Sequence, residues 1–261
     1  MGYARILKDH NGKESGYREC DGEVAYMPKQ QSYEKIFRRV KIDIDTMEVL
    51  NHDFIKDKQR VYRKGILLRG ITPEGFHVYN AAYTGNHQVI YTPYGDAKVA
   101  HPASFEVLDE GIGKYGAEGY GRDEEFVYFF TYSTDTPYAV RIKGCKNPAA
   151  FSILSDGYTK DDVHVYYSQV IVKTADPQSF SVLSDGYAAD DKHIFWRNKL
   201  LKANRQTFGV WGNGYACDDK QVFYQDRLLD VLPDSFQILE KEGCAEDDRH
   251  VFCCGNIIRI K

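Results

Sequence analysis

The sequence predicts an all-β protein built from tandem β-hairpin repeats of about 29 residues. The first observation behind this prediction is internal repetition, because the segment Phe151–Tyr166 recurs almost residue for residue as Phe180–Phe195. The second is local chemistry, since each copy alternates short runs of strand-forming residues with turn residues. A fixed period of this length is typical of a stack or a ring of equivalent units.

The repeat consists of an aromatic residue followed by x-Val/Ile-Leu, then Gly-Tyr, then Asp-Asp, then Val/Ile-Tyr/Phe. Its first position is occupied by Met47, Phe76, Phe105, Phe151, Phe180, Phe208 and Phe236. The interval between Phe105 and Phe151 is longer than the others, because it contains extra residues near 110–117 and a connection at 131–147. We therefore expect residues 1–45 to hold a partial repeat and an insert, and residues 46–261 to hold seven repeats packed as one continuous domain.

Four very short strands are expected in each repeat. The aromatic-x-Val/Ile-Leu run predicts the first strand, and Ser-Asp-Gly after it predicts a turn. Gly-Tyr begins the second strand, Asp-Asp marks a second turn, and Val-Tyr-Tyr (165–167) is typical of the third. Two-residue turns then precede the fourth strand, at Lys64-Gly65, Ser168-Gln169, Arg197-Asn198, Gln225-Asp226 and Gly255-Asn256. The one helix that the sequence suggests spans Tyr33–Val40.

Two architectures suit such repeats. A single hairpin is marginal in water and must stack on its neighbours to bury its apolar face. An open, curved solenoid or superhelical sheet is the favoured arrangement, because propeller blades usually need roughly 40 residues or more. A closed, propeller-like ring of seven units stays open as the alternative.

Composition narrows the class of protein. The net charge of −4, with both signs interspersed, argues against a partner made of nucleic acid. No apolar run is long enough to span a membrane. The first residues carry no signal peptide, which predicts a cytoplasmic location, or a periplasmic or secreted one if a leader has been removed. The six cysteines lack the spacing of a zinc site, so we expect no metal and no cofactor.

The acidic pairs are the most obvious candidates for chemistry. They recur as Asp161-Asp162, Asp190-Asp191, Asp218-Asp219 and Asp247-Asp248. Acidic loops bind calcium in some β-rolls, but calcium needs six or more converging oxygens. We expect a structural role instead, in which the first Asp accepts backbone N–H groups of the hairpin loop. His164, His193 and His250 recur before the third strand and are expected to be polar residues facing solvent.

No motif for nucleophilic, metal-dependent or phosphate chemistry is found, so the sequence predicts a protein that is not an enzyme. Residues with a singular role should break the repeat, which directs attention to the insertions. Tyrosines facing outward from the third strand are a second option, as anchors for a protein or a glycan. The candidate binding residues are Glu110, Lys114, Tyr115, Tyr132, Tyr138, Tyr166 and Tyr224.

The repeat also resembles a known family. Asp176–Phe195, Phe151–Tyr167 and Phe208–Tyr224 are similar to the DKNYY repeats of bacterial proteins, with Asp-Lys-Asn-x-Val-Tyr-Tyr represented by Asp57-Lys58-Gln59-Arg60-Val61-Tyr62. The resemblance covers roughly residues 45–261. It implies a bacterial source and a repeat fold, and because the family is a domain of unknown function it transfers no catalytic residue.

Two functions are consistent with these features. The first is a non-catalytic protein-binding module, in its most concrete form an immunity-type inhibitor of a toxin or effector. The alternative is a cell-envelope module that binds glycan through exposed rows of tyrosine. A protein partner should depend on the irregular insertions, whereas a glycan should depend on residues that recur in several repeats.

Overall fold

The computed structural model describes residues 5–28, 37–113, 116–132 and 139–261. The described residues form short β-strands, 3-10 turns and loops, without an α-helix. They divide into two compact units, residues 1–140 and 141–261. The strands pair into small antiparallel sheets, and none of the sheets in the described ranges closes into a barrel. The predicted all-β repeat architecture is confirmed.

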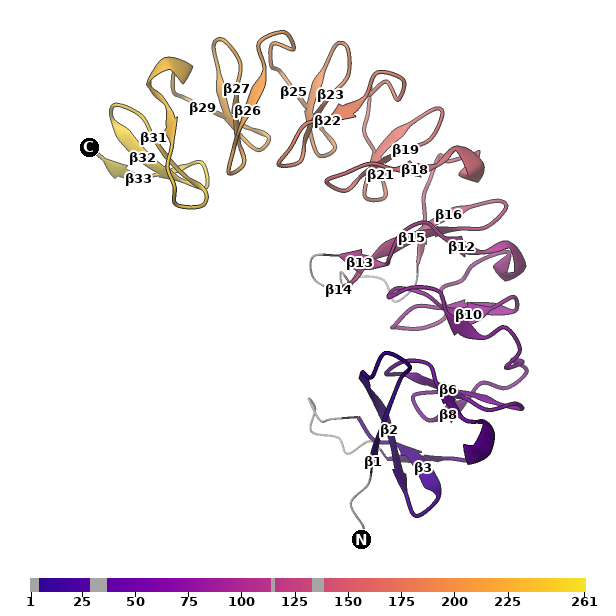
Figure 1. The fold of residues 1–261 in the computed structure, drawn as a ribbon. Coiled ribbons are helices and arrows are strands. Elements are labelled where there is room, and N and C mark those ends of the chain that lie inside the picture. Colours follow the sequence, from indigo (N-terminus) through magenta and orange to yellow (C-terminus); the bar gives the residue numbers. More distant parts are fainter. Residues whose placement is uncertain (1–4, 29–36, 114–115, 133–138) are drawn as a thin grey trace. The chain divides into compact units, whose positions relative to one another are not determined.

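The first unit contains one sheet for the N-terminal segment and one for each following repeat (Figure 1). The N-terminal sheet comprises β1 (Arg5–Lys8), β2 (Glu14–Cys20), β3 (Glu23–Tyr26) and β4 (Arg38–Val40). The next comprises β5 (Glu48–Val49), β6 (Phe54–Lys56), β7 (Val61–Arg63) and β8 (Ile66–Leu67). The third comprises β9 (His77–Val78), β10 (Thr84–Asn86) and β11 (Val89–Tyr91). The fourth comprises β12 (Glu106–Val107), β15 (Gly119–Arg122), β16 (Val127–Phe130) and β17 (Val140–Arg141), and a separate hairpin pairs β13 (Ile112–Gly113) with β14 (Gly116–Ala117).

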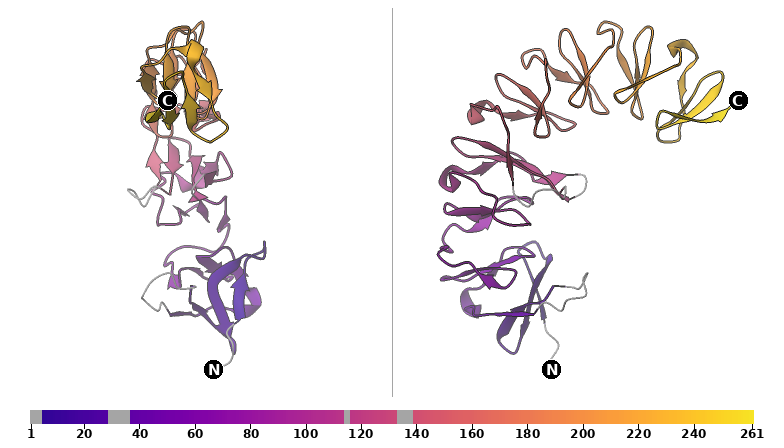
Figure 2. Two further views of the ribbon diagram at one scale, coloured as in Figure 1. Left: turned by 90° about the vertical axis from the view of Figure 1, so that its left-hand side faces the viewer. Right: turned by 180° about the vertical axis from the view of Figure 1, so that it is seen from behind.

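The second unit contains four sheets that follow one another in a single open row (Figure 2). They are β18 (Ser152–Ile153), β19 (Tyr158–Lys160), β20 (Val165–Tyr167) and β21 (Val170–Ile171); β22 (Ser181–Val182), β23 (Tyr187–Ala189), β24 (Ile194–Trp196) and β25 (Lys199–Leu201); β26 (Gly209–Gly212), β27 (Tyr215–Cys217), β28 (Val222–Tyr224) and β29 (Arg227–Leu229); and β30 (Gln237–Ile238), β31 (Cys244–Glu246), β32 (His250–Cys253) and β33 (Asn256–Ile260). The fourth strand lies at the edge of every sheet.

Short 3-10 turns lead into several repeats. They are η1 (Ile44–Thr46), η2 (Pro102–Ser104), η3 (Pro148–Ala150) and η4 (Pro233–Ser235). In the last three, proline occupies the first turn, where its missing N–H is not needed. Each of these turns is followed directly by the first residue of its repeat, and the first strand begins one residue later than the sequence pattern suggested.

Two local predictions are wrong. The expected helix over Tyr33–Val40 is contradicted at its end, because Arg38–Val40 is a strand that pairs with β3 through Val24↔Val40 and Tyr26↔Arg38; residues 33–36 lie outside the described residues. The last two-residue turn is Cys254-Gly255 rather than Gly255-Asn256, since Cys253 pairs with Asn256. The other four predicted two-residue turns have the expected register.

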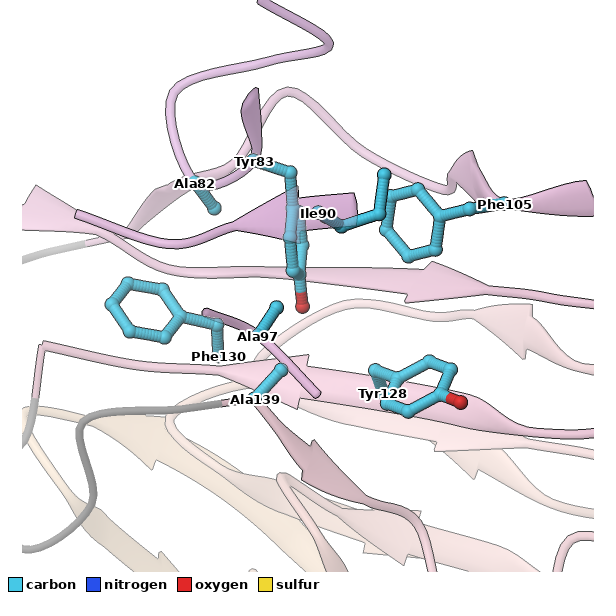
Figure 3. Close-up of a cluster of buried hydrophobic side chains, with 8 residues drawn as sticks. All are labelled: Ala82, Tyr83, Ile90, Ala97, Phe105, Tyr128, Phe130 and Ala139. Atoms are coloured by element: carbon cyan, nitrogen blue, oxygen red, sulfur yellow. The ribbon is translucent and has the colours of Figure 1, made fainter. Parts of the chain in front are cut away.

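The apolar core lies between successive sheets. In the second unit, one cluster combines Tyr158, Val165 and Val172 of one repeat with Phe180 and Phe195 of the next. In the first unit, Figure 3 shows Tyr83 pointing from its own sheet towards the sheet that carries Tyr128 and Phe130, all of them buried. In the second unit such clusters join each sheet to the next, so its two inner sheets bury both of their faces.

Candidate binding surface

The first aspartate of each acidic pair holds its hairpin loop together. Asp190 Oδ1 accepts the N–H groups of Lys192 (2.8 Å) and His193 (2.6 Å), and its Oδ2 accepts that of Asp176 (3.1 Å). Asp190 itself is buried. The matching residue accepts the same pair of loop N–H groups in five further repeats, at Asp57, Asp123, Asp161, Asp218 and Asp247. The predicted structural role of this aspartate is confirmed.

These hydrogen bonds dominate the ionisation of the buried carboxyls. Burial alone would raise the pKa of Asp161, but the N–H of His164 and the hydroxyl of Tyr166 hold the pKa below its ordinary value. The same balance lowers the pKa of Asp123, Asp190 and Asp247. Among the described residues, no group of three or more His, Cys, Asp or Glu side chains is arranged to hold a metal ion.

A second set of hydrogen bonds joins neighbouring repeats. The hydroxyl of Tyr158 donates to the carbonyl oxygens of Gly186 (2.8 Å) and Arg197 (3.0 Å) in the following repeat. Tyr187 makes the equivalent bonds to Gly214 (2.9 Å) and Gln225 (3.1 Å). The tyrosine of the Gly-Tyr pair is thus a link between two repeats, which explains why it recurs.

The expectation of outward tyrosine rows is wrong at Tyr166. This residue is fully buried, and its hydroxyl donates to Asp161 Oδ2 at 2.8 Å. Its ring also lies against that of Phe151 in the same repeat, with the ring centroids 5.9 Å apart, so the face of the third strand that carries Tyr166 is covered. Tyr224 is half-buried, with its ring centroid 4.8 Å from that of Tyr215.

The recurring histidines also differ from the expectation. His193 Nδ1 lies 3.2 Å from Asp190 Oδ2, and His250 Nδ1 lies 3.2 Å from Asp247 Oδ2. His164, His193 and His250 are half-buried rather than exposed to solvent. They belong to the hairpin loops and do not form a separate site.

Exposed apolar side chains gather where the first unit departs from the repeat. Ile112, on the inserted β13–β14 hairpin, is 72% exposed, Tyr132 is 51% exposed and Tyr94 is 39% exposed. The rings of Tyr94 and Tyr132 lie 5.6 Å apart. Gly116, in the strand paired with the Ile112 strand, lies against the Tyr132 ring. We call Tyr94, Glu110, Ile112 and Tyr132 the hairpin patch.

Acidic groups lie within and beside the hairpin patch. Glu110 is exposed, and Glu118 accepts a hydrogen bond from the Thr131 hydroxyl at 2.8 Å. Burial raises the pKa of Asp109, although the N–H groups of Tyr120 and Gly111 oppose this. Burial, and then a hydrogen bond to Tyr132, raises the pKa of Tyr94 above its ordinary value, so the Tyr94 hydroxyl is neutral at neutral pH.

Of the predicted binding residues, Glu110 lies two residues before β13, and Tyr132 lies against Gly116 of β14. Lys114, Tyr115 and Tyr138 lie outside the described residues. Sequence reasoning missed Tyr94 and Ile112. Ile112 could have been found from the sequence, because it is an aliphatic residue between Gly111 and Gly113 in an insertion. It matches no position of the repeat that would account for it as a core residue. Tyr94 could not have been found in this way, since it meets Tyr132 only through the fold.

These features define a class of protein, a tandem β-repeat stack whose recurring polar residues serve the fold. The model of the DKNYY family matches residues 3–94 and 83–227, and the chain belongs to that family. The match begins further towards the N-terminus than the resemblance suggested. No curated protein and no solved structure matches the chain. No helix among the described residues is long and apolar enough to cross a membrane.

Proposed function

We propose that the chain is a non-catalytic protein-binding module and that the hairpin patch is its contact surface. In its most concrete form the protein is an immunity-type inhibitor of a toxin or effector. The hairpin patch carries the proposal, because Ile112 is exposed on an inserted hairpin and the paired, exposed rings of Tyr132 and Tyr94 lie beside the second strand of that hairpin.

The chemistry of the hairpin patch suits a protein partner. Aromatic side chains are enriched at the centres of protein interfaces, where they bury much area at a low entropic cost. Tyr94 is fixed by Phe130, with ring centroids 5.8 Å apart, and in turn supports Tyr132. A surface ordered before binding loses less conformational entropy on association.

Glycan binding, the alternative, receives less support. It required tyrosines that recur in several repeats and face solvent. The tyrosines of the Gly-Tyr pairs that join repeats are buried, as is Tyr166 in the third strand. Their hydroxyls are used inside the fold.

The test is affinity capture by the purified chain, compared with a double variant carrying Ile112→Asp and Tyr132→Ala. Val163→Asp is the matched control, because Val163 is 59% exposed and belongs to the second unit, whereas the hairpin patch belongs to the first. We expect one stoichiometric protein partner that the control retains and the double variant loses. A partner retained equally by all three proteins, or the absence of a saturable partner, would contradict the proposal.

A further inference from the structure

A row of aliphatic side chains recurs on the edge strands of the second unit. Leu200 of β25 is 51% exposed, Leu228 of β29 is 53% exposed and Ile257 of β33 is 54% exposed. They occupy one register position, opposite Phe195, Phe223 and Phe252 respectively. We call these three residues the leucine row. It lies in a different unit from the hairpin patch, so a role for the leucine row is independent of the function proposed for that patch.

In the first sheet of the second unit, another segment of the chain covers the register position that the leucine row occupies in the later sheets. Ile171 of β21 is the matching residue, opposite Tyr166, and it is half-buried. A Cβ at Gly144 would lie 3.1 Å from Ile171 Cδ1, so the connecting segment rests directly on this side chain. The leucine row continues that covered surface into the next three repeats, where it is about half exposed.

The spacing of the leucine row follows from the stacking of the sheets. Aromatic rings interdigitate between neighbours, with centroids 5.7 Å apart for Tyr187 and Phe208 and 5.4 Å apart for Tyr215 and Phe236. Sheets packed face to face in this way lie about 10 Å apart. Matching side chains in successive repeats are therefore separated by about the same distance.

An α-helix reproduces this spacing on one face. Seven helical residues rise about 10.5 Å and return to nearly the same side, with a drift of about 20° per heptad. An extended strand does not, because three residues cover about 10 Å but place the third side chain on the opposite face. A polyproline helix has a comparable rise of about 9.3 Å per three residues.

The charges beside the leucine row favour an α-helix over a polyproline helix as the bound segment. Lys199 and Arg227 are exposed and directly precede Leu200 and Leu228. Lys199 Nζ lies 3.8 Å from Asp226 Oδ2, and Arg227 Nη1 lies 2.9 Å from Asn256 Oδ1, so each cation lies beside the gap between two members of the leucine row. An α-helix can present a carboxylate beside every leucine, whereas the prolines of a proline-rich segment carry no charge.

We propose that the leucine row is a docking surface for an amphipathic α-helix of a protein partner. The helix carries a leucine-like residue at every seventh position and Glu or Asp beside it. Its axis runs along the stack of sheets, with one apolar side chain over each repeat.

The test uses a fluorescein-labelled helical peptide of three heptads, with one leucine per heptad, Glu beside each leucine and Ala and Lys elsewhere. One leucine per heptad is too sparse for the peptide to form its own coiled coil. The first control peptide has the same composition with the leucines at every fifth position. The second is a proline-rich peptide with leucine at every third position.

Fluorescence anisotropy with the full chain should show saturable binding of the heptad peptide and much weaker binding of both controls. Leu200→Lys and Leu228→Lys should each weaken binding roughly tenfold or more, because each removes a buried apolar contact. Leu232→Lys, at a residue 70% exposed outside the row, should leave binding unchanged.

Equal binding of the fifth-position peptide, tighter binding of the proline-rich peptide, or no effect of the row variants would overturn the proposal. So would reversible dimerisation in analytical ultracentrifugation that Leu228→Lys abolishes, since a second copy would then be the occupant. Because Leu200 and Leu228 are about half exposed, both variants should fold, and an unchanged circular dichroism melt confirms this.

Discussion

Tyr187 donates its hydroxyl to Gly214 in the following repeat, at 2.9 Å, across the interface that also buries the Tyr187 ring. The same hydroxyl lies 3.1 Å from the carbonyl oxygen of Gln225, in the next two-residue turn of that repeat. One side chain therefore fixes two separate loops of its neighbour. The bond explains the recurrence of tyrosine where any aromatic residue would fill the space.

Replacing Tyr187 by Phe should lower the free energy of unfolding by about 1–2 kcal/mol. The ring volume is kept, but two buried carbonyl oxygens lose their donor. Urea denaturation followed by circular dichroism measures the change. Tyr167→Phe is the control, because the structure shows no hydrogen bond of the Tyr167 hydroxyl to a described residue; an equal loss in both variants would contradict the account.

The two members of an acidic pair should differ sharply. Asp190→Ala removes the acceptor of at least three backbone N–H groups and should cost roughly 2–3 kcal/mol. Asp191→Ala, at an exposed residue, should change stability by less than about 0.5 kcal/mol. Thermal and urea melts of both variants provide the comparison, and similar losses would mean that the pair acts as a unit.

Stability should fall as the pH drops below about 4. Hydrogen bonding depresses the pKa of Asp123, Asp161, Asp190 and Asp247 in the folded protein, so these groups bind protons more weakly when folded than when unfolded. Their contribution is complete above the unfolded pKa of about 4 and is lost as the pH falls through the folded pKa values.

A series of melts from neutral pH downwards measures this loss. The decline should be shallower in Asp190→Asn, which removes one of the four groups. The third repeat sheet already carries Asn86 at this position, where its Oδ1 accepts the N–H of Gln88 at 3.0 Å. A pH dependence unchanged by the substitution would assign acid lability to other carboxyls.

The cysteines should react in a definite order. Burial, reinforced by the neighbouring Asp161 carboxylate, raises the pKa of the Cys145 thiol to about 12, so very little thiolate exists at neutral pH. Cys254 is exposed in its turn. Iodoacetamide labelling followed by peptide mass spectrometry should modify Cys254 in the native protein and Cys145 only after unfolding; early modification of Cys145 would show that its repeat opens readily.

The fold could be predicted from the sequence because its signals are local and repeated. Gly-Tyr, Asp-Asp and the turn before each edge strand recur in phase, and each performs the same local task in most copies. The expected helix at Tyr33–Val40 failed because Arg38–Val40 completes a sheet with β3, and tertiary pairing overrides a weak local preference.

The candidate site was harder to predict. The sequence directed attention to the insertions, and Glu110 and Tyr132 both lie beside the inserted β13–β14 hairpin. It could not indicate that Tyr166 is buried, because the alternation of a strand shows which side chains share a face but not whether a second sheet covers the other face. Nor could it bring Tyr94 to Tyr132, which are 38 positions apart.

The tyrosine links have a consequence for how such chains change in length. Tyr158 reaches Gly186 and Arg197, and Tyr187 reaches the matching Gly214 and Gln225, so successive junctions are chemically interchangeable. If one complete repeat were deleted, each tyrosine hydroxyl would still meet an equivalent carbonyl acceptor in the next repeat. A deletion that removed only part of a repeat would instead expose two apolar sheet faces. Gain or loss of complete repeats therefore preserves the hydrogen bonds between repeats. It changes only the length of the surface that the chain can present to another molecule.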